Sequence, residues 1–97
     1  MPGIAGVSRP ELIAETKVAP VFPHMARRLR VSSRVVLQAV ILRDGTVGSI
    51  EVIHEPRPNL GLADAAIAAV RQWRYRPAMQ EGRPVNASLT VSIDFSH

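Results

Sequence analysis

Residues 34–54 read RVVLQAVIL-RDG-TVGSIEVIH, two runs rich in β-branched side chains with an Asp-Gly pair between them. Such runs on both sides of a short turn predict a β-hairpin. The pair Asp44 and Gly45 favours a two-residue type I′ turn, in which both central residues take positive φ. The hairpin therefore comprises strands at residues 34–42 and 46–54.

The two strands differ in which of their faces are apolar. Residues 34–42 are apolar on both faces, which is typical of a central strand covered on both sides or flanked by a partner chain. In the return strand, Ile50 and Val52 are expected on the core face, with Ser49 and Glu51 on the other face. The sequence therefore places the first strand in the middle of a sheet.

Two helices are predicted beside the hairpin. Residues 24–30 follow Pro23, which suits the first turn of a helix. Their apolar members are expected to share one face: Met25, Ala26 and Leu29. Residues 62–73 form an Ala-rich amphipathic pattern that Pro77 ends. Its apolar positions recur at helical spacing: Leu62, Ala63, Ala66, Ile67, Val70 and Trp73.

A third strand is predicted at residues 85–95 (VNASLTVSIDF), where apolar and polar side chains alternate throughout. A strand with one buried and one exposed face has this pattern. A helix that crosses back over the sheet returns this strand beside the first strand, because antiparallel sheets separate strands of like direction by one neighbour. The expected fold class is α+β, a three-stranded antiparallel sheet of order 2-1-3 with two helices packed on one face.

The third strand becomes an edge that lacks the usual protection against pairing. It has no proline after Pro84 and almost no charge before Asp94, whereas natural edges commonly carry Lys, Pro or a bulge. Such an edge is covered by a partner chain, captures an extended peptide, or is masked by the N-terminal arm. The arm, residues 1–17, has weak periodicity, with helix formation considered across residues 10–15.

The same stretches resemble the C-terminal domain of TonB proteins over residues 18–95. The most specific part is WRYRPA, placed between an Ala-rich helix and a Gly-x-Pro-Val turn. Phe22 stands where Tyr is more usual, and Ser33 where Gly is frequent; neither change alters the expected fold. The matching stretches are PVFP (20–23) with Ala26-Arg27, DGTV (44–47), LADAAIAAV (62–70), WRYRPA (73–78) and EGRPV (81–85).

This resemblance implies a periplasmic domain of an inner-membrane-anchored energy transducer that a proton-driven motor powers. Residues 18–97 would form the domain and residues 1–17 a flexible arm or linker remnant. The domain would bind an extended segment of an outer-membrane receptor by adding it as a strand to the open edge. The expected contacts are the backbone groups of Ala87, Ser88, Leu89, Thr90, Val91, Ser92, Ile93 and Asp94, with Arg71, Arg74 and Tyr75 as further partner contacts.

A second interpretation keeps this fold and changes the partner. The domain would then be an interaction module of another envelope machine, such as a motility apparatus, a sensor or a secretion protein, and would bind a partner that is not a receptor. A third interpretation is assembly through paired edge strands, so the expected oligomeric state is a monomer or a weak homodimer.

Composition argues against several other functions. The chain has 97 residues, a net charge of +4 and no cysteine, so it forms one small domain without thiolate metal sites or a Cys nucleophile. His24, His54 and His97 lack metal-site spacing, and no nucleophile-elbow motif is present. We therefore expect no enzyme activity, metal or cofactor. Nucleic-acid binding would require interleaved exposed aromatic side chains or a recognised module, and the chain has four aromatic residues in all, so we expect no nucleic-acid partner. The basic residues form two clusters, Arg27, Arg28, Arg30 and Arg34, and Arg71, Arg74, Arg76 and Arg83.

Overall fold

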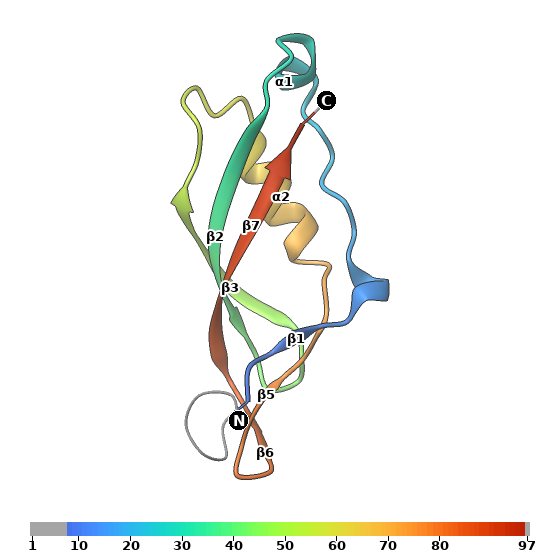
Figure 1. Ribbon diagram of the computed structural model, residues 1–97, viewed down its shortest axis with the longest axis vertical. Coiled ribbons are helices and arrows are strands. Elements are labelled where there is room, and N and C mark those ends of the chain that lie inside the picture. Colours follow the sequence, from blue (N-terminus) through green and yellow to red (C-terminus); the bar gives the residue numbers. More distant parts are fainter. Residues whose placement is uncertain (1–7, 97) are drawn as a thin grey trace.

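The central feature is a three-stranded antiparallel sheet in the order β3-β2-β7 (Figure 1). The computed structural model describes residues 8–96. Strand β2 (Ser33–Ile41) lies between β3 (Val47–His54) and β7 (Ala87–Phe95). The predicted order, in which the first strand of the hairpin is central and the last strand forms an edge, is confirmed.

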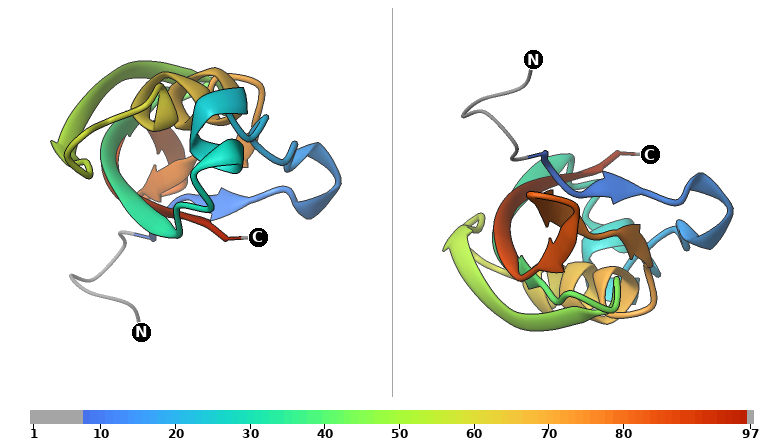
Figure 2. Two further views of the ribbon diagram at one scale, coloured as in Figure 1. Left: turned by 90° about the horizontal axis from the view of Figure 1, so that it is seen from above. Right: turned by 90° about the horizontal axis from the view of Figure 1, so that it is seen from below.

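The sheet is buried on one face only. Every second side chain of β2 is fully buried, namely Val35, Leu37, Ala39 and Ile41. The opposite face of this strand is open, because Arg34 and Gln38 are exposed and Val36 and Val40 are half-buried. The expectation that both faces of β2 are covered is therefore wrong: the helices lie on one side of the sheet, and the other side faces solvent (Figure 2).

Helix α2 (Leu62–Val70) packs across the buried face of β2 and β3. It ends at Val70, so the prediction that it continues to Trp73 is wrong. After Val70 the chain continues in a tighter turn, in which Gln72 N–H and Trp73 N–H donate to the carbonyls of Ala69 and Val70. The guanidinium of Arg74 donates hydrogen bonds to the carbonyls of Arg71 (3.1 Å) and Trp73 (2.8 Å). Such donors satisfy carbonyl groups at and just after a helix C-terminus. Trp73 nevertheless belongs to the core and is 3% exposed.

Helix α1 (His24–Arg28) has only five residues and contributes one of them, Ala26, to the core. Of the three apolar residues expected to share one face, only Ala26 is buried, and Met25 and Leu29 are exposed. Side chains from the extended chain on either side of the helix, Phe22 and Val31, pack against the core instead. The ring of Phe22 meets that of Phe95 edge to face, with 5.6 Å between centroids.

The hairpin between β2 and β3 is confirmed, but its turn type is not. Gly45 N–H donates to Leu42 C=O (2.8 Å) and Leu42 N–H to Thr46 C=O (2.9 Å). Gly45 has a φ of 87°, whereas Asp44 is not among the residues with positive φ. This is a type I turn followed by a left-handed glycine, the usual three-residue hairpin loop. The carboxylate of Asp44 accepts hydrogen bonds from the hydroxyl and N–H of Thr46, which lower the pKa of Asp44.

Two small antiparallel pairs complete the described chain. Strands β5 (Ala78–Gln80) and β6 (Arg83–Val85) form a hairpin across Glu81 and Gly82, whose φ values are 51° and 78°. The sequence indicated a turn at residues 80–84 and did not predict the two short strands that it joins. Strand β1 (Glu11–Leu12) pairs with β4 (Tyr75–Arg76), and a 3-10 turn, η1 (Ala14–Thr16), follows. The arm is therefore extended across much of the stretch considered helical.

The long third strand is interrupted at one residue. Asn86 separates β6 from β7, so the strand predicted at 85–95 begins as β7 only at Ala87. The side-chain oxygen of Asn86 accepts a hydrogen bond from Arg43 N–H at 2.8 Å. This contact joins the start of β7 to the end of β2.

Candidate functional site

Strand β7 has an open edge with regular geometry. It pairs with β2 in continuous register from Ser33↔Phe95 to Ile41↔Ala87, and no other strand pairs with it among residues 8–96. The opposite edge, β3, differs because its pairing with β2 contains two register shifts. Bulges of this kind bend an edge and interrupt the ladder that an added strand would continue. Among these two edges, β7 is therefore the better template for a further strand.

Alternation along β2 identifies which groups of β7 point outward. Leu42 N–H donates to Thr46 on the β3 side, and the carbonyl of Val40 also lies on that side, beside Gly48. Backbone groups alternate between the two neighbours of a central strand, so the odd-numbered residues of β2 bond to β7. Their register partners on β7 are also odd-numbered. The backbone groups that face outward consequently belong to Ser88, Thr90, Ser92 and Asp94.

The side chains of β7 divide cleanly between its two faces. Val91, Ile93 and Phe95 are buried, and Ala87 and Leu89 are half-buried on the same face. On the other face, the side chains of the four residues with outward backbone groups are exposed, and three of these residues are Ser or Thr. A peptide at this edge would meet backbone hydrogen-bonding groups and small hydroxyl side chains.

A groove lies beside the C-terminal half of β7. Its volume is about 290 Å³, and residues 17–20 form the wall opposite Ser92 and Asp94. Trp73 and Ile93 contribute apolar lining. The indole N–H of Trp73 donates to Val18 C=O at 2.9 Å, which fixes the wall to the core. The ammonium of Lys17 lies 5.6 Å from the centroid of the Trp73 ring, within cation–π range.

An ion pair joins the end of β7 to β2. The Arg34 Nε donates to the Asp94 carboxylate at 2.7 Å, and the two residues face each other in register. This hydrogen bond lowers the pKa of Asp94 and raises that of Arg34. Asp94 is therefore ionised at neutral pH, and a negative charge lies at one end of the groove.

The described part of the N-terminal arm does not pair with β7. Glu11 and Leu12 lie opposite Arg76 and Tyr75 in β4, and Ser8 exchanges hydrogen bonds with Met79. The hypothesis that the arm masks the β7 edge is therefore wrong for residues 8–16, whereas residues 1–7 lie outside the described residues.

The other predicted contacts do not gather at this edge. Arg71 is exposed beyond the end of α2, and the Arg74 guanidinium binds backbone carbonyls. Tyr75 is 5% exposed, so it is a core residue, and burial raises the pKa of its phenol. The sequence favoured a core position for Trp73 and gave no indication that residues 17–20 form a wall of this groove. The prolines at 20 and 23 indicated only that this stretch is extended.

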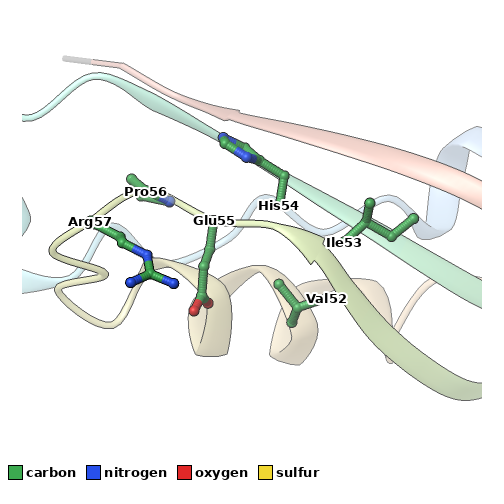
Figure 3. Close-up of a pocket in the computed structure, with 6 residues that line it drawn as sticks. All are labelled: Val52, Ile53, His54, Glu55, Pro56 and Arg57. Atoms are coloured by element: carbon green, nitrogen blue, oxygen red, sulfur yellow. The ribbon is translucent and has the colours of Figure 1, made fainter.

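A larger hollow, of about 550 Å³, lies at the end of β3 (Figure 3). One continuous segment, residues 52–57, lines it. The imidazole of His54 points away from the side chains of Glu55 and Arg57, and Glu55 accepts a hydrogen bond from Asn59 at 2.6 Å. These groups do not converge on a common point as catalytic groups do. Within residues 8–96, no group of three His, Cys, Asp or Glu side chains could hold a metal ion; His97 lies outside that range.

Comparisons with known proteins agree on one family. The family model described as the C-terminal part of the Gram-negative bacterial TonB protein matches residues 18–97. Protein TonB of Klebsiella pneumoniae is 28% identical over 94 residues, covering 97% of this chain and 35% of the relative. Protein tonB2 of Pseudomonas aeruginosa is 30% identical over 77 residues, covering 79% of this chain and 28% of the relative.

The solved structures include a matching fold. The solution NMR structure of the Pseudomonas aeruginosa TonB C-terminal domain superposes with a TM-score of 0.68 at 23% identity, and the match covers 99% of this chain and 91% of that one. The chain spans about a third of the length of the curated relatives. None of the helices in the described residues is long and apolar enough to span a membrane.

Proposed function

The chain belongs to the family of C-terminal domains of Gram-negative TonB proteins, and from this premise we propose that it captures an extended segment of an outer-membrane receptor. The segment would add as a strand to the open edge of β7. The observation that carries this proposal is the uninterrupted edge, on which Ser88, Thr90, Ser92 and Asp94 each present an outward N–H and C=O. Strand addition uses these groups for affinity.

The groove favours one position for the bound peptide. A strand that follows β7 past Ser92 enters the space between this strand and residues 17–20. Its side chains alternate between the two faces of the sheet, so one of them lies over Trp73 and Ile93. An apolar side chain fits there, because its burial against these residues adds a hydrophobic contribution. Backbone bonds would then supply general affinity, and this position would supply selectivity.

The cellular setting follows from the relatives and is part of the proposal. Because the chain belongs to the family of TonB C-terminal domains and spans about a third of its curated relatives, we place this domain in the periplasm as part of a longer protein. That protein would be anchored in the inner membrane and coupled to a proton-driven motor. Mechanical force on the captured receptor segment would then be transmitted through the backbone hydrogen bonds between β7 and β2.

An amide NMR titration of this chain tests the proposal. The ligands are N-terminal segments of outer-membrane receptors from the source organism. We expect shifts concentrated on residues 85–95 and at the groove wall, residues 17–20. A well-folded spectrum that no segment perturbs would overturn receptor capture and favour a partner in another envelope machine.

One substitution pair tests the backbone mechanism. Thr90→Pro removes an outward N–H and places the proline ring where the added strand must pair, so affinity should fall at least about tenfold. Thr90→Ala keeps the N–H and should bind within about twofold of the wild type. The fold should survive in both variants, with lower stability for the proline, because this N–H does not bond to β2. Equal affinities of the two variants would exclude strand addition at this position.

A further inference from the structure

An exposed apolar stripe lies at α1, at one end of the long axis of the molecule (Figure 1). Its members are Val21, Met25 and Leu29, which are 80%, 52% and 59% exposed. Leu29 N–H donates to Met25 C=O at 3.0 Å, so these two side chains lie on successive turns of the same helix side. Val21 precedes the helix, so three large apolar side chains are exposed within nine residues. Exposed apolar patches mark interaction sites.

Basic residues alternate with this stripe along the sequence. Arg27, Arg28 and Arg30 are exposed, and the ion pairs within residues 8–96 involve none of them. No Asp or Glu occurs in the sequence between Lys17 and Arg43. We call the stripe and these three arginines the tip patch. It combines apolar side chains with positive charge that the neighbouring sequence does not neutralise.

Packing of neighbouring residues into the core fixes the position of the tip patch. Ala26 is fully buried, and Phe22 packs edge to face on Phe95. The apolar side chains therefore cannot turn inward without removing α1 from the core. Their exposure is a property of the folded domain, because the inward face of this short helix is already occupied.

We propose that the tip patch docks on a bilayer surface that contains anionic phospholipids. The arginines would bind phosphate groups, and the apolar stripe would enter the boundary between headgroups and acyl chains. Each basic residue near such a surface contributes about 1 kcal/mol, roughly a fivefold change in partitioning. The charge and the apolar side chains thus act on the same partner.

The shape of the patch favours a bilayer over an acidic protein. The stripe lies on a protruding helix at the end of a molecule with extents of 49 × 22 × 21 Å, not in a groove. A protein partner would need an apolar hollow with an acidic rim that matches this protrusion, whereas a bilayer interface accepts any such protrusion. This docking uses other groups than strand capture does, because β7 runs along the length of the molecule and offers backbone groups at its side, whereas the stripe and the arginines lie at the α1 end itself.

Vesicle flotation with the complete chain tests this proposal. The vesicles contain phosphatidylcholine alone or phosphatidylcholine with about one third phosphatidylglycerol. We expect partitioning at least about tenfold stronger on the anionic vesicles. Arg27→Gln with Arg28→Gln should lower that partitioning about 25-fold, which is two factors of about five. Met25→Ser with Leu29→Ser should lower it about tenfold, while amide spectra confirm that the fold is retained.

Matched control substitutions elsewhere distinguish binding through the tip patch from a general effect of net charge. Arg9 and Arg83 are also exposed, and Ile53 is 55% exposed on β3. Arg9→Gln with Arg83→Gln, or Ile53→Ser, should change partitioning by less than about threefold. Equal losses in control and tip variants would overturn the proposal. Absence of binding to anionic vesicles would also overturn it, and tip amides that shift only with an acidic peptide would identify a protein partner instead.

Discussion

At the scale of single residues, Gly45 shows how one position serves both local and tertiary structure. Its φ of 87° closes the hairpin turn, and its carbonyl accepts a hydrogen bond from Tyr75 N–H at 2.9 Å. A Cβ atom at this position would collide with the carbonyl oxygen of Tyr75. The glycine is therefore required by the close approach of a second chain segment as well as by the turn.

Gly45→Ala and Gly82→Ala separate these two requirements. Both glycines have positive φ, but a Cβ at Gly82 would meet no atom within 4 Å. Gly82→Ala should cost about 1–2 kcal/mol for the left-handed conformation alone. Gly45→Ala should cost at least about 2 kcal/mol more, because the backbone of Tyr75 must move. Urea denaturation measures the unfolding free energy of both variants. Similar decreases would show that the backbone near Tyr75 moves at little cost.

At the scale of elements, the N-terminal arm pairs with β4 and holds this short strand in place. Thr16 anchors the arm through its hydroxyl, which donates a hydrogen bond to Ile13 C=O at 2.7 Å and accepts one from Arg74 N–H at 2.8 Å. Ile13 N–H also donates to Arg74 C=O at 2.9 Å. The arm thereby sets where residues 17–20 begin, and these residues form the groove wall opposite β7.

Thr16→Ala should destabilise the domain by about 1–2 kcal/mol, because Arg74 N–H loses its partner. Thr16→Ser keeps the hydroxyl and should cost less than about half as much. The unfolding free energy of the two variants provides the comparison, and hydrogen exchange at Arg74 should accelerate only in the alanine variant. Equal destabilisation would assign the effect to the methyl group and not to the hydrogen bonds.

At the scale of the whole molecule, two surfaces of different chemistry lie on one small domain. The β7 edge offers backbone groups along the side, and the tip patch offers charge and apolar side chains at one end. Salt affects the two interactions differently, because about 1 M salt shortens the Debye length from about 10 Å to about 3 Å. Backbone hydrogen bonds in a sheet are much less sensitive to this screening.

Raising the salt concentration from about 0.1 M to about 1 M should therefore weaken vesicle partitioning by at least about tenfold. The affinity for a receptor segment should change by less than about threefold over the same range. Flotation and NMR titration in the same buffers measure the two responses. A strong salt dependence of peptide binding would indicate that charged side chains such as Asp94, and not the backbone, dominate that interface.

Much of the fold was predictable because its signals are local. The hairpin follows from two β-branched runs around Asp44-Gly45, and the alternation in residues 85–95 predicts one buried face. Strand order then follows from connectivity. The expectation that both faces of β2 are covered was wrong, and the exposure of Met25 and Leu29 could not be foreseen, because apolarity indicates that a side chain can be buried, not that a neighbouring element covers it.

The sequence by itself determined the sheet order and the open β7 edge, because period-two patterning and a tight turn act between neighbouring residues. The tertiary structure decided the groove and the tip patch. The groove depends on Trp73 bonding to Val18, 55 residues away in sequence, and the arm depends on Thr16 bonding to Arg74, 58 residues away. The tip patch depends on Phe22 filling the space beside Phe95. Such contacts leave no local periodicity, since packing between distant segments selects them only after the chain has folded.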